Sequence, residues 1–178
     1  MSVLSDLYHG KLADLHRAMD RLVSLLREVE GRIEDKALVR ARLSDYRVKS
    51  LESIERKALR RQWRDEDALA ECPDLIGARV MCNNVEDVYR FAELLRERLP
   101  WDSAFSIQDY IKAPNERGYR ALHINFMLDA GHGLAPDRVA CEVQIRTRLQ
   151  DAWSELTHGD IYKQGQLPDD LREQTVHL

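Results

Sequence analysis

Two segments near the C-terminal end, 121–129 (ALHINFMLD) and 138–146 (RVACEVQIR), decide the fold, because apolar and polar side chains alternate along both. Successive side chains of a β-strand point to opposite faces of a sheet, so each segment is predicted to form a strand with one apolar and one polar face. The intervening AGHGLAPD holds two glycines and a proline, which favours a turn and an antiparallel hairpin.

The polar face of this hairpin is the first candidate site. It would collect His123, Asn125, Glu142, Gln144 and Arg146. A carboxylate, two amides, an imidazole and a guanidinium suit ligand binding, whereas the alternative is an ordinary solvent-facing surface of an antiparallel sheet.

The rest of the chain predicts helices and one more strand. Apolar residues recur at helical spacing within 4–34, which predicts an amphipathic helix. They are Leu15, Met19, Leu22, Leu26, Val29 and Ile33.

A basic helix is expected to begin at Ser50 as N-cap and to run through Ile54 and Leu59 towards Trp63. A buried strand is expected over 75–82 after a Pro-Asp turn. The helix that follows is expected to have Asn84 as N-cap and Pro100 as terminator.

Composition bounds the class of protein. The chain has 178 residues, of which 44% are hydrophobic and 33% charged, as in a globular domain. Its three cysteines are an odd count without C-x-x-C spacing, which argues against disulfides and structural zinc. No apolar run is long enough to span a bilayer, so we expect a cytoplasmic protein without membrane contact.

Charge is distributed unevenly. The formal net charge is −4, yet residues 36–64 hold ten Lys/Arg and only three Asp/Glu. One basic segment on an acidic protein favours a small polyanion such as a nucleotide phosphate. The alternative is a solvated basic helix face.

Within the basic segment, Arg47, Lys49 and Ser50 are expected at the N-terminus of the second helix, where free amides favour an anion. Ser53 and Lys57 lie four residues apart and share one face of that helix.

Two carboxylates are candidate Mg²⁺ ligands. Asp74 directly precedes the predicted strand over 75–82, and Glu142 lies on the polar face of the hairpin. Mg²⁺ takes few carboxylates and several waters or phosphates, which suits such positions. The alternatives are a turn-forming role for Asp74 and an exposed, Arg-paired strand residue for Glu142.

An aromatic residue ends a loop between these candidates. DYIKAPNERGYRALH carries Gly118 before Tyr119, and a tyrosine on such a loop can stack on a nucleobase. The alternative is a ring that folds over the edge of the core. The common phosphate-loop, nucleophile-elbow and dinucleotide fingerprints are missing from the sequence.

Four motifs in order, RVKSLESIERK, PDLIGARVMC, DYIKAPNERGYRALH and CEVQIRTRLQDAWSELTHGDIYK, resemble the RelA/SpoT synthetase domain over about residues 40–163. The small alarmone synthetases are the most similar members, and the family's hydrolase module has no counterpart here. The resemblance implies an α+β fold, a nucleotidyltransferase-like mixed β-sheet flanked by α-helices. We expect an N-terminal helix over 1–35, the synthetase domain over 36–165 and a tail over 166–178.

The resemblance also implies the reaction, transfer of pyrophosphate from ATP to the 3′-hydroxyl of GDP or GTP with Mg²⁺, which makes (p)ppGpp. Matching by motif assigns residues to the donor. Arg47 and Arg79 would sandwich the adenine, and the donor phosphates would be held by Lys49, Ser50, Ser53 and Lys57.

The same matching assigns the remaining roles. Asp74 and Glu142 would bind Mg²⁺, and Glu142 would also take the 3′ proton. Tyr119 would stack on the acceptor base, and the acceptor nucleotide would be contacted by Lys112, His123 and Gln144. Because Asp74 and Arg79 would face opposite ways on a regular strand, we also expect a bulge or bend at Gly77.

Departures from the family pattern leave alternatives open. Asn115 and Glu116 stand where a basic residue is common, and Ala121 stands where the family has serine. One alternative is a toxin-type synthetase that acts on adenosine nucleotides or the 3′ end of tRNA and pairs with an antitoxin. Another is a catalytically inactive nucleotide-binding module. Assembly into a homo-oligomer also stays open.

Overall fold

One mixed sheet of five strands organises the computed structural model, which describes residues 2–34, 39–100, 103–116, 118–130 and 138–155. The spatial order is β1-β2-β5-β4-β3, and only β2 and β5 run parallel. The strands are β1 (Ala41–Val48), β2 (Ile76–Cys82), β3 (Ser106–Asp109), β4 (Leu122–Asp129) and β5 (Arg138–Thr147).

The predicted hairpin is confirmed. β4 and β5 pair antiparallel, with His123 opposite Gln144 and Asn125 opposite Glu142. Burial alternates along both strands, so the apolar residues face the core and the polar set shares the other face. The predicted turn lies almost entirely outside the described residues.

Two long helices cover the apolar face of the sheet. α1 (Val3–Ile33) is capped by Ser2, and every apolar residue predicted for its packing stripe is buried. α4 (Val85–Arg98) is capped by the Asn84 side chain, whose oxygen accepts from the Asp87 amide at 2.8 Å, and Pro100 follows its end. Both predicted helices are therefore confirmed.

Shorter helices lie on the other side. α2 (Leu51–Arg61) begins after Ser50, whose hydroxyl accepts from the Ser53 amide, and α3 (Ala68–Glu71) follows. The predicted helix through Ile54 and Leu59 is confirmed. Ile54 is fully buried, whereas Leu59 is 83% exposed, because the buried residues of α2 form a narrow stripe of Ile54 and Ala58.

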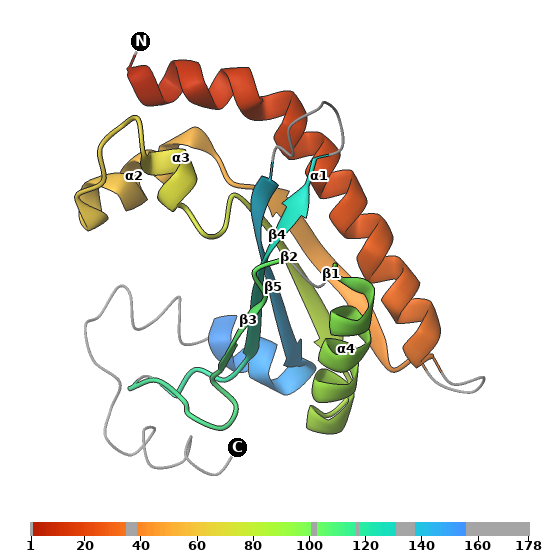
Figure 1. The fold of residues 1–178 in the computed structure, drawn as a ribbon. Coiled ribbons are helices and arrows are strands. Elements are labelled where there is room, and N and C mark those ends of the chain that lie inside the picture. The colour runs from red at the N-terminus through yellow and green to blue at the C-terminus, as the bar shows by residue number, and fades with distance from the viewer. Residues whose placement is uncertain (1, 35–38, 101–102, 117, 131–137, 156–178) are drawn as a thin grey trace.

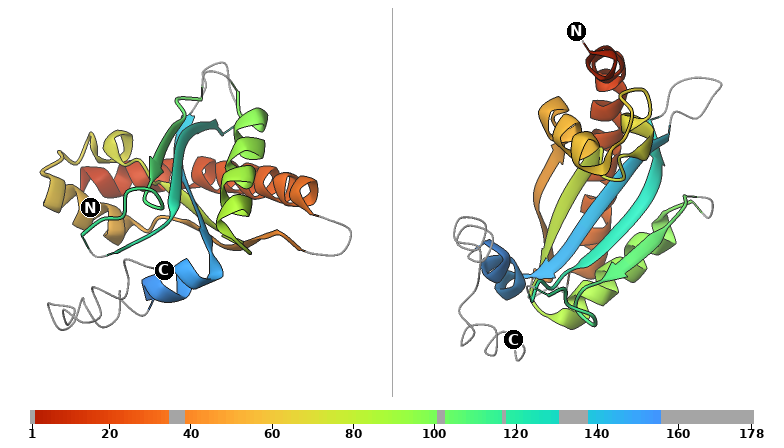
Figure 2. Two further views of the ribbon diagram at one scale, coloured as in Figure 1. Left: turned by 90° about the horizontal axis from the view of Figure 1, so that it is seen from below. Right: turned by 90° about the vertical axis from the view of Figure 1, so that its left-hand side faces the viewer.

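In Figure 1, α4 and the C-terminal half of α1 lie to the right of the sheet, whereas α2 and α3 lie to its upper left, below the N-terminal half of α1. A further helical stretch, residues 148–155, continues directly from β5 on the left. The right-hand view of Figure 2 shows this stretch and α2 at opposite ends of the sheet. Part of the polar face is therefore left open between them.

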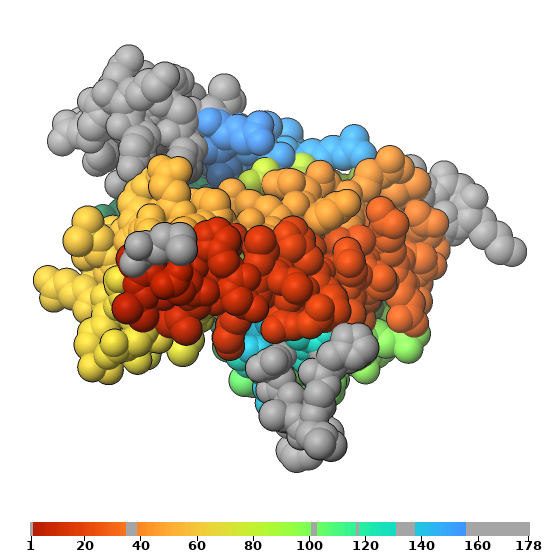
Figure 3. Space-filling view, turned by 90° about the horizontal axis from the view of Figure 1, so that it is seen from above, coloured from red at the N-terminus to blue at the C-terminus, as the bar shows by residue number. Residues whose placement is uncertain are grey.

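The N-terminal helix belongs to the core of the domain. Its buried side chains share one hydrophobic cluster with residues of β2, β4, β5 and α4. In the space-filling view of Figure 3, α1 forms a continuous ridge with the yellow segment that holds α2 and α3 at its N-terminal end. The division at residue 35 stays a prediction, and the tail over 166–178 lies outside the described residues.

Two strands were missed by the sequence prediction. β1 occupies part of the basic segment, so Arg47, which we expected at the N-terminus of the second helix, lies on a strand. β3 is short, and its first three residues are exposed. The expected irregularity at Gly77 is absent, because β2 pairs with β5 in unbroken register through Gly77. The register shift lies instead on β1, between Leu43 and Asp45.

Cys72, Cys82 and Cys141 are buried free thiols, in agreement with the sequence. Over the described ranges, no helix combines the length and apolar character that crossing a bilayer requires.

The exposure of Leu59 predicts a contrast between two leucine substitutions. Leu26→Ala empties a fully buried site and is expected to lower the free energy of unfolding by roughly 2–5 kcal/mol. Leu59→Ala, the control, is expected to change it by less than about 0.5 kcal/mol. Urea unfolding followed by circular dichroism measures both. Equal losses would contradict the position of α2.

Candidate functional site

Two transverse rows of polar residues cross the open face of the sheet. The first row runs from Asp45 on β1 through Arg79 and Gln144 to His123 on β4. The second runs from Arg47 through Gly77 and Glu142 to Asn125 in the same strand order. Paired residues of neighbouring strands point to the same face, so this arrangement follows from the strand register alone.

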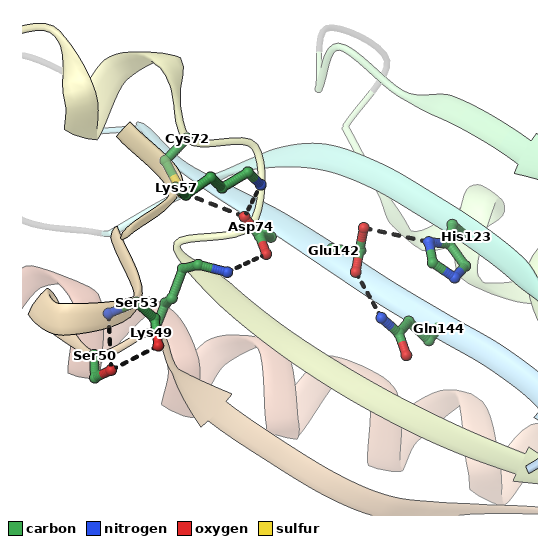
Figure 4. A network of polar contacts seen from close by, with 9 residues as sticks. All are labelled: Lys49, Ser50, Ser53, Lys57, Cys72, Asp74, His123, Glu142 and Gln144. Carbon is green, nitrogen blue, oxygen red and sulfur yellow. Dashed lines mark hydrogen bonds and ion pairs between the residues drawn. The ribbon is translucent and has the colours of Figure 1, made fainter. Parts of the chain in front are cut away.

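Asp74 forms the centre of a charged cluster at the α2 end of this face (Figure 4). Its Oδ2 lies 2.5 Å from Lys49 Nζ and its Oδ1 lies 2.7 Å from Lys57 Nζ. Cys72 Sγ donates to Oδ1 at 3.3 Å. One lysine comes from the end of β1 and the other from α2, so the carboxylate joins three elements that are separate in sequence.

Charge controls the ionisation of Asp74. Burial by itself would raise the pKa of this carboxyl group, but the hydrogen bonds and positive charges of Lys49 and Lys57 outweigh it and lower the pKa to about 2. Asp74 is therefore ionised throughout the neutral range. The two lysines are held at the same place, side by side.

Glu142 lies further along the face within a chain of hydrogen bonds. Gln144 Nε2 donates to Glu142 Oε1 at 2.8 Å, and His123 Nδ1 lies 3.3 Å from Oε2. Tyr119 Oη lies 2.8 Å from His123 Nε2. The chain is satisfied when the tyrosine donates to Nε2 and Nδ1 carries the proton that faces Glu142.

The pKa of Glu142 is also lowered. Burial raises it, but the hydrogen bond and charge of His123 and the hydrogen bond from Gln144 act more strongly in the other direction. The negative charge of Asp74 raises the pKa of Glu142, so the two carboxylates interact electrostatically. An ionised Glu142 can coordinate a cation or accept a proton.

Tyr119 lies in a cluster of three rings with Tyr110 and His123. The ring centroids are 5.1–5.6 Å apart with steep interplanar angles. Gly118 before it has φ of 71°, a left-handed conformation that favours glycine. The predicted loop, with Gly118 before Tyr119, is therefore present. The Tyr119 ring packs beside the hairpin, and its hydroxyl contacts His123 Nε2.

A cleft joins the two clusters. It is lined by Asp45, Arg47, Asp74, Gly77, Ala78, Arg79, Glu142 and Gln144. Lys49 and Lys57 contact Asp74, which lines the cleft. His123 contacts Glu142, which also lines it, and Tyr119 contacts His123. Most of the residues selected from the sequence are therefore brought together by the fold.

Three selected residues behave differently. Ser50 and Ser53 are engaged with each other, since the Ser50 hydroxyl donates to Ser53 Oγ at 2.9 Å. Lys112 lies over the Tyr89 ring, with Nζ 3.6 Å from Asp109 Oδ2. It lines a different hollow, between α4 and β3, on the helix-covered side of the sheet. The structure does not bring Lys112 to the cleft.

Sequence analysis missed several residues of this region. Asp45 lines the cleft from an unpredicted strand, and Cys72 contacts Asp74 from a loop. Arg146, selected for the polar face, is only 1% exposed and forms an ion pair with Asp151 of the helical stretch over 148–155. The period-2 pattern identified its face, but only the packing shows what covers it.

The donor atoms suit a hydrated cation. No group of three or more side chains fit for metal binding occurs in the part of the chain that the structure describes. Asp74 and Glu142 nevertheless present ionised oxygens to one cleft, and Mg²⁺ in nucleotide sites uses one or two carboxylates together with phosphates and water. A cation at Asp74 would compete with the two lysines that already engage both oxygens.

The fold is that of small alarmone synthetases. The structure of small alarmone synthetase 1 from Bacillus subtilis with its product pppGpp superposes with a TM-score of 0.79 at 25% identity, covering 96% of this chain and 88% of that one. Small alarmone synthetase 2 from the same organism gives 0.77 at 26% identity, covering 94% and 88%.

Sequence relatives agree. The chain is 31% identical over 134 residues to the GTP pyrophosphokinase YwaC of Bacillus subtilis. The matched stretch covers 71% of this chain and 63% of that protein. YjbM of the same organism, also a GTP pyrophosphokinase, is 31% identical over 127 residues, 71% of this chain and 59% of that protein. The chain therefore matches about six-tenths of the length of these relatives.

Residues 46–167 match the sequence pattern of the region found in RelA / SpoT proteins. The chain belongs to the RelA/SpoT family.

The Asp74 cluster predicts a specific pH dependence of stability in buffer with EDTA. The folded-state pKa, about 2, lies below the ordinary 3.8, so the unfolded chain binds the proton first and stability falls as pH drops through this window. The loss is expected to reach roughly 2 kcal/mol. Urea unfolding between pH 5 and about 2 measures it.

Asp74→Asn should lack this component, whereas the control Asp65→Asn, at an exposed carboxylate, should keep it. Equal pH profiles for the wild type and Asp74→Asn would contradict the ion-pair geometry.

Proposed function

We propose that this protein is an ATP-dependent pyrophosphokinase that transfers the β,γ-pyrophosphate of ATP to the 3′-hydroxyl of GDP or GTP. The relatives named above are GTP pyrophosphokinases, and one was solved with pppGpp bound. The observation that carries the proposal is the cleft in which a paired-lysine carboxylate, Asp74, and a hydrogen-bonded carboxylate, Glu142, lie on one sheet face.

The donor nucleotide is assigned to the β1–α2 side of the cleft. Lys49 and Lys57 place two positive charges at one point, which suits the phosphates of ATP. The N-terminus of α2 at Ser50 and Ser53 adds amides and hydroxyls. Arg47 and Arg79, on neighbouring strands of the cleft, are assigned to the two faces of the adenine.

The acceptor nucleotide is assigned to the β4–β5 side. Tyr119, beside His123, would stack on the base, and His123 and Gln144 would contact the nucleotide next to Glu142. Lys112 lines the hollow between α4 and β3 and does not line the cleft. Loop movement would be required before it reached the same ligand.

Mg²⁺ fits as the cofactor, with Asp74 and Glu142 as its protein ligands. Bound there, it would supply neutralisation of phosphate charge. The protein groups perform the remaining tasks. Lys49 and Lys57 stabilise negative charge on the transferred pyrophosphate, and ionised Glu142 accepts the proton of the acceptor 3′-hydroxyl.

The reaction is an in-line displacement. The acceptor 3′-oxygen forms a bond to the β-phosphorus while the bond from that phosphorus to the oxygen bridging to the α-phosphate breaks. AMP leaves with the bridging oxygen, and the proton passes to Glu142. ATP and guanine nucleotides are cytoplasmic metabolites, so we place the protein in the cytoplasm.

The proposal is tested by incubating the protein with γ-³²P-ATP, Mg²⁺ and, separately, GDP, GTP, ADP, ATP alone and bulk tRNA. Label is expected on GDP or GTP by thin-layer chromatography. Label on an adenosine nucleotide or on RNA would instead identify a toxin-type synthetase, for which an antitoxin partner would then be sought. Absence of transfer to every acceptor would overturn the pyrophosphokinase and favour a binding module.

Glu142→Gln is expected to retain nucleotide binding and to reduce kcat by at least roughly 100-fold, because general base catalysis contributes about 10²–10⁴. The amide keeps the size of the side chain but cannot accept the proton. Glu93→Gln, at an exposed position of α4 on the other side of the sheet, is the matched control and should leave kcat unchanged. Full turnover in Glu142→Gln would remove Glu142 from the role of base.

A further inference from the structure

Arg146 is a buried positive charge beside the cleft. It follows Gln144 on the polar face of β5, yet only 1% of its surface is exposed. A buried guanidinium requires a counter-charge, since desolvation without one is costly. Its NH2 lies 2.8 Å from Oδ1 of Asp151, in the helical stretch over 148–155 that continues from β5. Asp151 is thus tied to a partner that cannot turn to solvent.

The same carboxylate oxygen also contacts Arg79. Arg79 NH1 lies 3.4 Å from Asp151 Oδ1 and 3.7 Å from Glu155 Oε1. The Asp151 side chain is 18% exposed and that of Glu155 is 69% exposed, so Asp151 is the better-shielded partner. Arg79 lines the cleft with Glu142 and Gln144. One oxygen therefore links a buried arginine to an arginine of the cleft.

Asp151 also determines the direction in which Arg79 points. On the β1 side, Asp45 is the register partner of Arg79 and lines the same cleft, so a second carboxylate is near. The ion pairs of Arg79 are made instead with residues of the 148–155 stretch. Both ion pairs are made by Nη1, so this end of the guanidinium points toward the 148–155 stretch.

We propose that Asp151 is a positioning residue that holds Arg79 in the orientation needed to stack on the purine of the donor nucleotide, which rests on the proposed function above. A planar guanidinium stacks on an aromatic face, and the ion pairs at Nη1 restrict the orientations that the Arg79 side chain can take. Arg146 anchors Asp151 in turn. Through Asp151, the buried guanidinium of Arg146 on β5 restrains the position of Arg79 in the cleft.

A double-mutant cycle of Arg79→Ala and Asp151→Asn tests this. The readouts are the Kd of a non-hydrolysable α,β-methylene ATP with Mg²⁺ by calorimetry, the KM for ATP, the KM for the guanine nucleotide, and kcat. Asp151→Asn is expected to raise the analogue Kd and the ATP KM roughly tenfold. The acceptor KM and kcat are expected to change by less than about twofold.

In the Arg79→Ala background, Asp151→Asn should cause no further loss of analogue affinity, because its effect passes through Arg79. Glu155→Gln, which removes the longer and more exposed ion pair, is the matched control and should change the Kd by less than about twofold. Additive losses in the cycle, or an equal rise in the acceptor KM, would overturn the positioning role.

Asp151→Asn leaves the buried Arg146 without its carboxylate, so the thermal stability of every variant is measured alongside its binding. Where Asp151→Asn fails to fold, the cycle is run with Arg146→Met in all four proteins, which removes the unpaired buried charge. Arg146 is too buried to touch a ligand directly. In this background Asp151 keeps Arg79 as a partner but loses its anchor, so the coupling is expected to be smaller but still present, and its complete loss would overturn the proposal.

The binding readout separates this inference from the proposed function. Coupled analogue binding in a protein that transfers no label would retain the role of Asp151 and refute the pyrophosphokinase. A wild type that transfers label, together with an additive cycle, would support the pyrophosphokinase and refute the role of Asp151. Failure of the wild type to bind the analogue would refute both.

Discussion

The site depends on the parallel pairing of β2 with β5. Its register sets Gly77 opposite Glu142 and Arg79 opposite Gln144, so residues of the assigned donor and acceptor sides lie in the same two rows. A slip of one residue would turn Glu142 into the core and Cys141 or Val143 to the cleft, because strand side chains alternate. The buried apolar faces of both strands prevent this. Core packing and cleft geometry are therefore one constraint.

Paired charges keep the cleft organised. Lys49 and Lys57 hold Asp74, His123 and Gln144 hold Glu142, and Asp151 holds Arg146. An uncompensated charge at any of these buried or half-buried positions would be costly, so each group stays near its partner. Such pre-placed charges would suit the polyanionic ligand proposed above, because they would need little reorganisation on binding.

Much of the fold followed from local patterns. The hairpin, α1, β2 and α4 were predicted because each carries a strong period or a cap, as in the residues alternating about Glu142 and the Asn84 cap. β1 and β3 were not. Both are edge strands with largely exposed side chains, and β1 also shifts register after Leu43, so neither shows a regular apolar alternation. They are strands because a neighbour pairs with them.

By itself, the sequence determined which chemical groups this protein has and which face of each regular element carries them, because side-chain periodicity is a local property. The face shared by His123, Glu142 and Gln144 was predictable on that basis. Only the tertiary structure decided that Asp74 joins Lys49 to Lys57, that Lys112 lies on the far side of β3, and that Asp151 bridges Arg146 and Arg79. These contacts join separate elements, and their geometry is set by strand register and helix packing, which depend on the whole core.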